Sequence, residues 1–581
     1  MNSLSGTDRA QTAVLGNLLL VAIAIVLGSI IVVVALGILE NPAAPPYAAV
    51  EVENGERVLL MQEQNLEEVL IQDEAGNIHG RMGSVGDTVS LAEVDPRLEY
   101  SIIAVGAEQS SKIRTLTASE LIGDISEPSS SPASVTASDI EGDGSESNPF
   151  IIRTDSELQA VGNETANLSP KDSYRLGNNI DASKTDEWNG GDGFDPIQDF
   201  EGAFDGDGHR ILGLTIARES EDNVGLFANV KKSGEIKSFS VEDFAISGAN
   251  AVGGVVGENQ GTIMEVSGGY QVSDVYDDAV VGNQNVGGLV GENTNGGQII
   301  DSSVRGKITG DSSEIAGLVG FNDGTVENSV STATVTIEEL GNRHVAGLVG
   351  TNEGTISDSY ATGDVTVNDA QDDFPRVGGL VGENFGTIER SHATGDVTGV
   401  EGASSSNHNY GGLVGIHWVG TIEESFATGD VETDGRAGSL VGRVSQLQAS
   451  GTATISNSYA TGSVTSREDT AGGIVGSLHN GYELEIDNSF ATGQISGRDT
   501  GGLVGEIGSG GDVDLEDSYW DNKTTGQSAA VGDGSADTTT NVEGLTTSQM
   551  AGNDADKNME LDFKEIWRTV SGSYPKFQWE S

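Results

Sequence analysis

Three aspartates in the second half of the chain follow the same glycine in successive repeats. They are Asp364, Asp396 and Asp430, and each comes directly after a Thr-Gly pair. If the repeats stack as parallel strands, the three carboxylates lie roughly 5 Å apart. Like charges at that spacing destabilise a sheet. Either salt screens this ladder of aspartates, or divalent cations such as Ca²⁺ bridge it through oxygen ligands.

Motifs for enzymatic chemistry are absent from the sequence. It contains neither His-Glu-x-x-His nor a phosphate loop ending in Lys-Ser or Lys-Thr, and its seven histidines are scattered. Because cysteine is absent, a disulfide, a thiol nucleophile and a Cys-ligated metal are excluded. Acidic residues follow the repeat, whereas catalytic carboxylates would gather on a few coils. We predict that the protein is not an enzyme and has no cofactor beyond structural cations; the alternative is a polysaccharide-acting enzyme on a β-helix scaffold.

Covalent modification is the third chemistry that the sequence suggests. Asn163, Asn167 and Asn522 each begin an Asn-x-Ser/Thr sequon. Such sequons accept N-linked glycans when they lie on surface loops of exported proteins. We therefore predict these three asparagines as N-glycosylation sites.

The composition restricts the partners of the chain. Among 581 residues, 90 are acidic and 29 are basic, so the formal net charge is −61. A phosphate backbone must be met by Lys and Arg, and nucleic acid is therefore excluded as a partner. The acidity is spread along the chain, which is typical of proteins that fold in high salt. The 82 glycines indicate many tight turns and hence β structure.

A repeat positions these residues. Its first element is Gly-Gly-Leu-Val-Gly or a close variant, and it recurs nine times between Gly257 and Gly505 at a mean spacing of about 31 residues. A Gly-Thr-Ile element and a Ser-aromatic-Ala-Thr-Gly element follow, as at 354–356 and 359–363. Periods of 20–50 residues indicate solenoids or propellers, and a four-stranded propeller blade needs about 40 residues or more. The pattern predicts an all-β, parallel β-solenoid of about nine to ten three-stranded coils.

The repeat also predicts which side chains are buried. We expect Leu or Val of the first element, Ile of the second and the aromatic residue of the third to face the interior. Tyr360 and Val365 lie five residues apart, so a regular strand would point them to opposite faces. A corner or bulge at Gly363 would place Asp364 outside and Val365 inside.

The repeat resembles the GLUG motif of bacterial and archaeal surface proteins. The similarity includes a lead-in such as Asn148-Pro-Phe-Ile-Ile and a closing segment with Ser518-Tyr-Trp-Asp and Trp567. It covers about 430 residues, from 148 to the C-terminus. The resemblance implies a fold and a surface location, and such repeats accompany adhesins.

The N-terminus predicts a membrane anchor. Residues 13–39 carry no charge, and about 20 such residues span a bilayer as a helix. The segment is too long for the apolar core of a secretory signal. Together with the preceding Asp8-Arg9-Ala10-Gln11, it resembles the N-terminus of haloarchaeal type IV pilins. This resemblance implies cleavage by a prepilin peptidase after Arg9 and Ala10, which leaves Gln11 first; the alternative is an uncleaved signal anchor.

The expected organisation has seven parts: leader peptide 1–10, hydrophobic pilin-type helix 11–40, pilin-like β domain 41–120, flexible linker 121–147, solenoid lead-in and N-terminal cap 148–251, GLUG-type repeats 252–517 and C-terminal cap 518–581. We predict a single-pass membrane protein of a halophilic archaeon with most of the chain outside the cell, in a pilus or in the envelope. Its expected role is that of a pilin-like adhesin or a structural component, and its expected partners are the membrane, the peptidase, other pilins and a surface or glycan ligand. Loops 366–376 and 398–409, which are longer than 432–436, are the predicted contact surface.

Overall fold

The structure is a computed structural model that describes residues 47–53, 57–64, 68–73, 78–85, 87–90, 100–105, 110–116, 125–269, 280–309, 313–337, 344–368, 374–399, 408–445 and 451–580. The predicted leader and apolar helix, and with them Arg9, Ala10 and Gln11, lie outside these residues. No helix of the described part is long and apolar enough to cross a bilayer. The chain divides into two units, 1–125 and 126–581.

The first unit contains two antiparallel sheets. One consists of β1 (Tyr47–Glu53), β2 (Arg57–Gln64) and β5 (Thr88–Ser90), and the other of β4 (Ile78–Met82), β3 (Glu68–Asp73), β6 (Tyr100–Val105) and β7 (Ser110–Leu116). Alternate residues are buried, as in Val58 and Leu60 of β2 and Ile102 and Ala104 of β6. The apolar runs 58–60 and 101–105 lie in β2 and β6, within the range 41–120 that the sequence predicts as a β domain.

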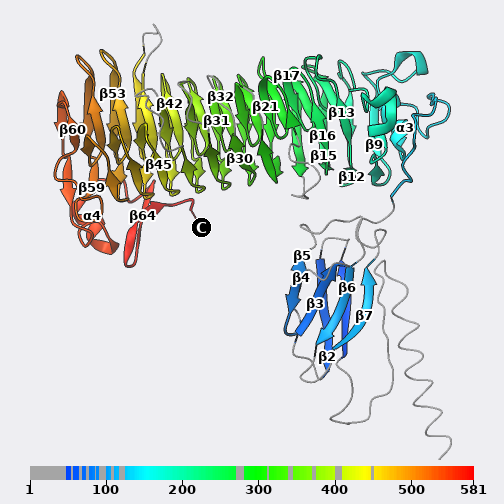
Figure 1. Ribbon diagram of the computed structural model, residues 1–581, viewed down its shortest axis with the longest axis horizontal. Coiled ribbons are helices and arrows are strands. Elements are labelled where there is room, and N and C mark those ends of the chain that lie inside the picture. Colours follow the sequence, from blue (N-terminus) through cyan, green and yellow to red (C-terminus); the bar gives the residue numbers. More distant parts are fainter. Residues whose placement is uncertain are drawn as a thin grey trace, which may run out of the picture. The chain divides into compact units, whose positions relative to one another are not determined.

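The second unit is an all-β parallel solenoid of about eleven turns (Figure 1). Its strands pair with the equivalent strands of the next coil in register, for example Val349 with Val381. One coil shows the pattern: β31 (His344–Ala346), β32 (Val349–Asn352), β33 (Thr355–Ser357), β34 (Tyr360–Ala361) and β35 (Val365–Val367). The solenoid fold predicted from the repeat is confirmed.

In the described residues, four long parallel sheets run along the solenoid, and a fifth parallel sheet contains only the strands 215–217, 245–247 and 280–281. The eleven-strand sheet contains β14 (Phe227–Val230), β18 (Val256–Asn259), β22 (Val290–Asn293), β27 (Val319–Asn322), β32, β37 (Val381–Asn384), β42 (Val414–His417), β47 (Val441–Val444), β52 (Val475–Leu478), β57 (Val504–Ile507) and β60 (Val531–Asp533). The nine-strand sheet contains β17 (Asn250–Gly253), β21 (Gln284–Gly287), β26 (Glu314–Ala316), β31, β36 (Arg376–Gly378), β41 (Asn409–Gly411), β46 (Arg436–Gly438), β51 (Ala471–Gly472) and β56 (Thr500–Gly501). The seven-strand sheet contains β25 (Lys307–Thr309), β30 (Thr334–Ile337), β35, β40 (Val397–Thr398), β45 (Val431–Thr433), β50 (Val464–Ser466) and β55 (Ile495–Ser496).

The fourth sheet, called the long sheet below, takes two strands from most coils. It contains β8 (Phe150–Ile152), β9 (Ser173–Leu176), β10 (Ile180–Asp181), β11 (Ala203–Asp205), β12 (Arg210–Leu212), β15 (Glu235–Glu242), β19 (Thr262–Gly269), β23 (Gln298–Ile300), β24 (Ser303–Arg305), β28 (Thr325–Glu327), β29 (Val330–Ser331), β33, β34, β38 (Thr387–Glu389), β39 (His392–Ala393), β43 (Gly420–Glu423), β44 (Phe426–Ala427), β48 (Ala453–Ser456), β49 (Tyr459–Ala460), β53 (Glu483–Asp487), β54 (Phe490–Ala491), β58 (Asp512–Glu516), β59 (Tyr519–Asp521), β61 (Thr538–Thr540) and β62 (Glu543–Leu545). The remaining elements of this unit are β13 (Thr215–Ala217), β16 (Ala245–Ser247), β20 (Val280–Val281), α3 (Asp155–Ala160), η2 (Glu164–Ala166), η3 (Thr185–Gly191), η4 (Gly552–Asp554), α4 (Ala555–Asn558), β63 (Trp567–Val570) and β64 (Ser573–Phe577).

The prediction of three strands in each coil is wrong, because a coil such as 344–367 contains five short strands. Gly347 separates β31 from β32, and a Cβ at this position would approach the Gly379 carbonyl oxygen to 2.2 Å. Asp358 separates β33 from β34 with a φ of +50°, a left-handed conformation that ordinary strand residues avoid. Gly347 therefore divides the first predicted element into two strands, and Asp358 separates the second element from the third.

The predicted burial of the third-element aromatic residue inside the coil is also wrong. Ile356 faces the interior, but the extra residue at Asp358 reverses the alternation, so that Ser359 and Ala361 face inward and Tyr360 faces outward. The predicted positions of Asp364 outside and Val365 inside are correct, for a different reason: regular alternation continues from Ala361, so no reversal at a corner is needed.

Two ladders of polar side chains run through the interior. In the asparagine ladder, each Nδ2 donates to the Oδ1 of the next coil at 2.8 Å; its members are Asn259, Asn293, Asn322, Asn352 and Asn384. In the serine ladder, each hydroxyl accepts a backbone N–H from the preceding coil; its members are Ser302, Ser329, Ser359, Ser391, Ser425, Ser458, Ser489 and Ser518. All these side chains are buried, and their hydrogen bonds, to one another in the asparagine ladder and to the backbone in the serine ladder, offset the cost of removing them from water.

The N-terminal end of the solenoid is covered by local structure. Helix α3 begins with a capping box formed by Thr154 and Glu157. Residues 126–147, predicted as part of a linker, lie against it, since Ser129 donates two hydrogen bonds to the buried Asp155 carboxylate. The Trp188 indole donates to the Ser129 carbonyl oxygen at 2.7 Å.

Candidate functional site

A column of outward residues on the long sheet changes character along the solenoid. Register pairs its members from coil to coil in the order Ser267, Ser303, Val330, Tyr360, His392, Phe426, Tyr459, Phe490 and Tyr519. The first members are small and the later ones are aromatic. Two different surfaces therefore occupy one face of the same sheet.

The aromatic half is a stack of rings, which we call the aromatic ladder (residues 360, 392, 426, 459 and 490). Successive ring centroids lie 4.5–5.1 Å apart, with interplanar angles of 4–8°. The ring faces are thus occupied by neighbouring rings, and only the edges point away from the sheet. A sugar stacks on an open ring face, so this ladder does not have the geometry of a row of sugar platforms.

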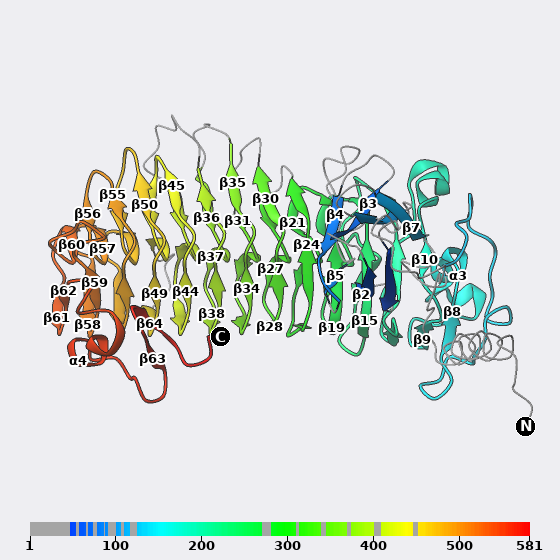
Figure 2. The same cartoon turned by 90° about the horizontal axis from the view of Figure 1, so that it is seen from below.

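The C-terminal tail, residues 546–580, covers the edges of the aromatic ladder. Its ribbon passes beside β44 and β49 in Figure 2. Trp567 and Phe577 are buried against the rings of Phe426, Tyr459 and Phe490. The tail runs back along the side of the coils as far as His392, whose ring centroid lies 6.3 Å from that of Trp579. The sequence predicted that these aromatic residues close the end of the stack; the structure places them on its flank.

Polar contacts hold the tail in position. The Tyr459 hydroxyl donates to the Glu580 carboxylate at 3.0 Å, and the Tyr574 hydroxyl donates to the buried Asp521 carboxylate at 2.7 Å. Burial lowers the pKa of His392 to about 4; the negative charge of Glu580 opposes this shift, and the positive charge of Lys576 adds to it to a smaller extent. His392 is therefore neutral at ordinary pH.

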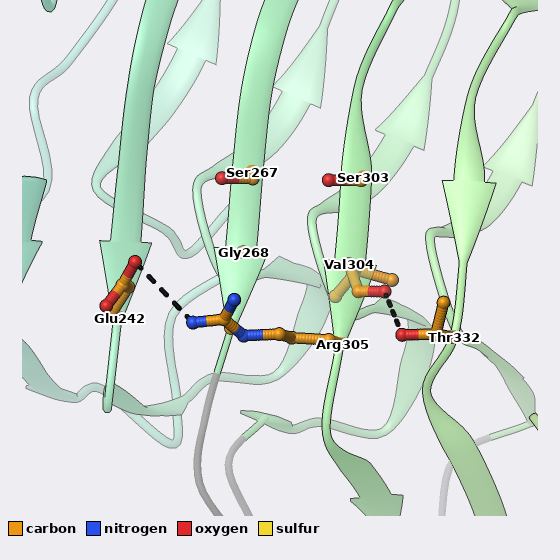
Figure 3. Close-up of a pocket in the computed structure, with 8 residues that line it drawn as sticks. Glu242, Ser267, Gly268, Ser303, Val304, Arg305 and Thr332 are labelled. Atoms are coloured by element: carbon orange, nitrogen blue, oxygen red, sulfur yellow. Dashed lines mark hydrogen bonds and ion pairs between the residues drawn. The ribbon is translucent and has the colours of Figure 1, made fainter. Parts of the chain in front are cut away.

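A hollow of about 170 Å³ lies on the other half of the column (Figure 3). Its residues come from four coils and are Glu242, Ser267, Gly268, Gly269, Ser303, Val304, Arg305 and Thr332. The Arg305 side chain extends from β24 across the Gly268–Gly269 backbone toward Glu242, as Figure 3 shows. A Cβ at Gly269 would meet Arg305 Nε at 2.8 Å, so the glycine leaves room for the guanidinium.

The ion pairs of this hollow are loose. Arg305 Nη2 lies 3.6 Å from one Glu242 oxygen, and Arg210 Nη1 lies 3.8 Å from the other. Ser240 donates to the same carboxylate at 3.1 Å. Within the described residues, the hydroxyls of Ser267 and Ser303 form no hydrogen bond. The hollow thus combines the Arg305 guanidinium group, the Glu242 carboxylate and the hydroxyls of Ser267 and Ser303, while Arg210 faces the other oxygen of the same carboxylate.

The structure places Asp364, Asp396 and Asp430 in one exposed row, each in contact with the next coil. Asp364 Oδ1 accepts the Asp396 N–H at 2.9 Å, Asp396 Oδ1 accepts the Asp430 N–H at 2.8 Å, and Asp430 Oδ1 accepts the Ser463 N–H at 2.7 Å. Each carboxylate therefore already has a backbone partner between coils. Among the residues described, no group of three His, Asp or Glu side chains is arranged to hold a metal ion.

The three predicted glycosylation sites are exposed, but their asparagines differ in side-chain hydrogen bonding and in backbone conformation. The side-chain oxygen of Asn163 accepts hydrogen bonds from Thr165, and Asn167 adopts a φ of +61° at the end of η2. Asn522 Nδ2, the atom that would carry a glycan, donates to the Gly544 carbonyl oxygen at 2.8 Å.

Of the predicted contact loops, residues 369–373 and 400–407 lie outside the described part of the chain.

A network of polar side chains that sequence reasoning missed joins the nine- and eleven-strand sheets. Glu383 is 4% exposed and contacts His344 Nδ1 at 3.1 Å, Arg376 Nη1 at 3.1 Å and the Trp418 indole N–H. Burial raises the pKa of Glu383, whereas burial and the nearby Arg376 lower the pKa of His344 to about 3. Arg376 and Glu383 belong to the same coil, whereas His344 and Trp418 come from the neighbouring coils and are brought to them by coil stacking.

The protein is an acidic parallel β-solenoid that contains GLUG motif repeats, matched at residues 282–309, 341–366 and 375–398. Halomucin of Haloquadratum walsbyi is a homologue, 38% identical over 131 residues, which cover 21% of this chain and 1% of halomucin. A chain of Evansella cellulosilytica described as a Gly-rich membrane protein is 34% identical over 131 residues, which cover 21% of this chain and 15% of that protein. The chain thus spans only a small part of the length of these relatives.

Among solved structures, the chain is similar to a Bacteroides ovatus protein described as an immunoglobulin A1 protease. The similarity covers 76% of this chain and 95% of the other, with 17% sequence identity and a TM-score of 0.23. At that level the comparison carries no argument about function.

Proposed function

We propose that this chain is a cell-surface protein of a halophilic organism, which presents its β-solenoid outside the cell. The observation that carries the proposal is the continuous stack of coils in a chain with a net charge of −61. A stack of coils that bury the same core can extend a long distance from a membrane while varying its loops. The names of its homologues, halomucin and a Gly-rich membrane protein, support this location.

The proposed attachment is the apolar segment 11–40, with cleavage by a prepilin peptidase between Ala10 and Gln11. In this proposal the protein is a pilin-like adhesin or a structural component of the pilus or envelope of a halophilic archaeon, it has no catalytic role, and other pilins are partners. The resemblance of residues 8–16 to pilin leaders supports it.

Display on intact cells tests the proposal. The full chain, carrying an epitope tag after residue 580, is expressed in a haloarchaeal host, and whole cells are treated with protease and labelled with antibody. We expect the solenoid to be labelled and removed by the protease, and the mature N-terminus to be Gln11 by sequencing. A chain protected until the cells are lysed would contradict the surface location, and an intact Met1 would contradict only the pilin-type processing.

A further inference from the structure

The hollow on the long sheet has unused capacity to bind an anion. Arg305 and Arg210 both face the single Glu242 carboxylate, at 3.6 and 3.8 Å, which is beyond hydrogen-bond distance. By contrast, Arg390 on the same sheet binds Asp358 through two hydrogen bonds of 2.7 and 2.8 Å. Within the described residues, the guanidinium groups of Arg305 and Arg210 form no hydrogen bond. Their forked donors match the two oxygens of a carboxylate.

The local charge is unusual for this molecule. Over the whole chain, acidic residues outnumber basic ones by 90 to 29, whereas the hollow and its edge bring two guanidinium groups to one carboxylate. In about 1 M salt the Debye length is only about 3 Å, so the general repulsion of the acidic surface is screened. Direct contacts with Arg305 would then decide whether an anion binds.

The shape of the hollow favours one sugar residue. A volume of about 170 Å³ is smaller than the roughly 300–1,000 Å³ of a pocket for a drug-sized ligand. Gly268 and Gly269 form its floor without side chains, and the free hydroxyls of Ser267 and Ser303 stand on neighbouring strands about 4.8 Å apart. Hydroxyls that both donate and accept are suited to the hydroxyl groups of a sugar.

We propose that this hollow binds a carboxylate-bearing sugar residue of an acidic polysaccharide. Arg305 binds the carboxylate, Ser267 and Ser303 hydrogen-bond the sugar hydroxyls, and Glu242 orients the Arg305 guanidinium group. The proposal concerns the solenoid alone and does not depend on how the chain is anchored.

Binding of defined oligosaccharides to the full chain tests this proposal. The probe is a trisaccharide of galacturonic acid, titrated calorimetrically in 2 M KCl, with the neutral trisaccharide of galactose and free acetate as comparison ligands. We expect the acidic trisaccharide alone to bind. Arg305→Met, which keeps the length of the side chain but removes its donors, should weaken binding about tenfold or more. Arg390→Met is the matched control and should bind as the unmodified protein does.

A second variant fills the hollow. Ser303 occupies the column position of Val330 and Tyr360, so Ser303→Phe should be accommodated on the outside of the coil and should abolish binding by occupying the space. Circular dichroism and thermal unfolding verify that it folds. No binding at millimolar ligand, equal binding of the neutral trisaccharide or of acetate, or unchanged affinity in Arg305→Met would each overturn the proposal.

Discussion

The asparagine ladder should contribute strongly to the stability of the coils it joins, and Asn352 is the position to test. Its Oδ1 accepts from Asn322 and its Nδ2 donates to Asn384, both at 2.8 Å, and the side chain is fully buried. The change Asn352→Ala removes both hydrogen bonds. It also leaves the Asn384 oxygen without its ladder partner, while Asn322 Nδ2 retains only a long contact of 3.4 Å to the Gly324 carbonyl oxygen.

The expected cost follows from these contacts. Two lost hydrogen bonds contribute about 1 kcal/mol each, and a buried polar group left unsatisfied costs a further ~1–3 kcal/mol. The free energy of opening the coils around residue 352 should therefore fall by about 3–5 kcal/mol. The loss should be local, because coils of a solenoid interact mainly with their neighbours.

Native-state hydrogen exchange in 2 M KCl measures this local opening. Backbone amides of 345–390 should exchange faster in Asn352→Ala, whereas those of 480–520 should be unchanged. Glu353→Ala, at the exposed adjacent position, is the control. If the two variants differ by less than about 0.5 kcal/mol in residues 345–390, the reasoning about the ladder is wrong.

Three further predictions concern salt, pH and the aspartate row. Because the chain has a net charge of −61, the solenoid should lose β structure near 0.05 M salt and regain it near 2 M. A circular dichroism spectrum that is the same at both salt concentrations would argue against adaptation to high salt. His417 is buried at the end of the asparagine ladder, and burial lowers its pKa from 6.5 to about 4. As the pH drops, the unfolded chain therefore takes up the proton before the folded chain does. The free energy of unfolding should fall between pH 6.5 and pH 4, by up to about 3 kcal/mol for this residue. His417→Asn should reduce that loss in urea titrations at pH 7 and pH 4.5, and an unaltered pH dependence would refute this assignment. Changing Asp364, Asp396 and Asp430 together to Asn keeps a side-chain oxygen for each backbone N–H and removes the like charges. The melting temperature in low salt should therefore rise. A lower melting temperature in the presence of Ca²⁺ would instead indicate cation bridging.

Sequence periodicity was sufficient to predict the scaffold. Nine copies of a Gly-Gly-Leu-Val-Gly element at about 31 residues require a stack, and the spacing leaves room for a solenoid coil but not for a propeller blade. The burial of Leu348 and Ile356 was likewise predictable, because strand alternation is a local rule.

The direction of the aromatic residues and the location of the hollow were decided by the tertiary structure. One left-handed residue, Asp358, reverses the alternation and turns Tyr360 outward, and periodicity alone does not reveal such a bulge. The outward rings are then buried by a tail whose contacts, such as Glu580 with Tyr459, span 121 residues of sequence. The hollow exists where Ser267 and Ser303 take the place of those rings and no such contact with the tail is formed. Local sequence determines which residues each coil can bury, whereas contacts between distant segments determine which outward side chains remain accessible to a ligand.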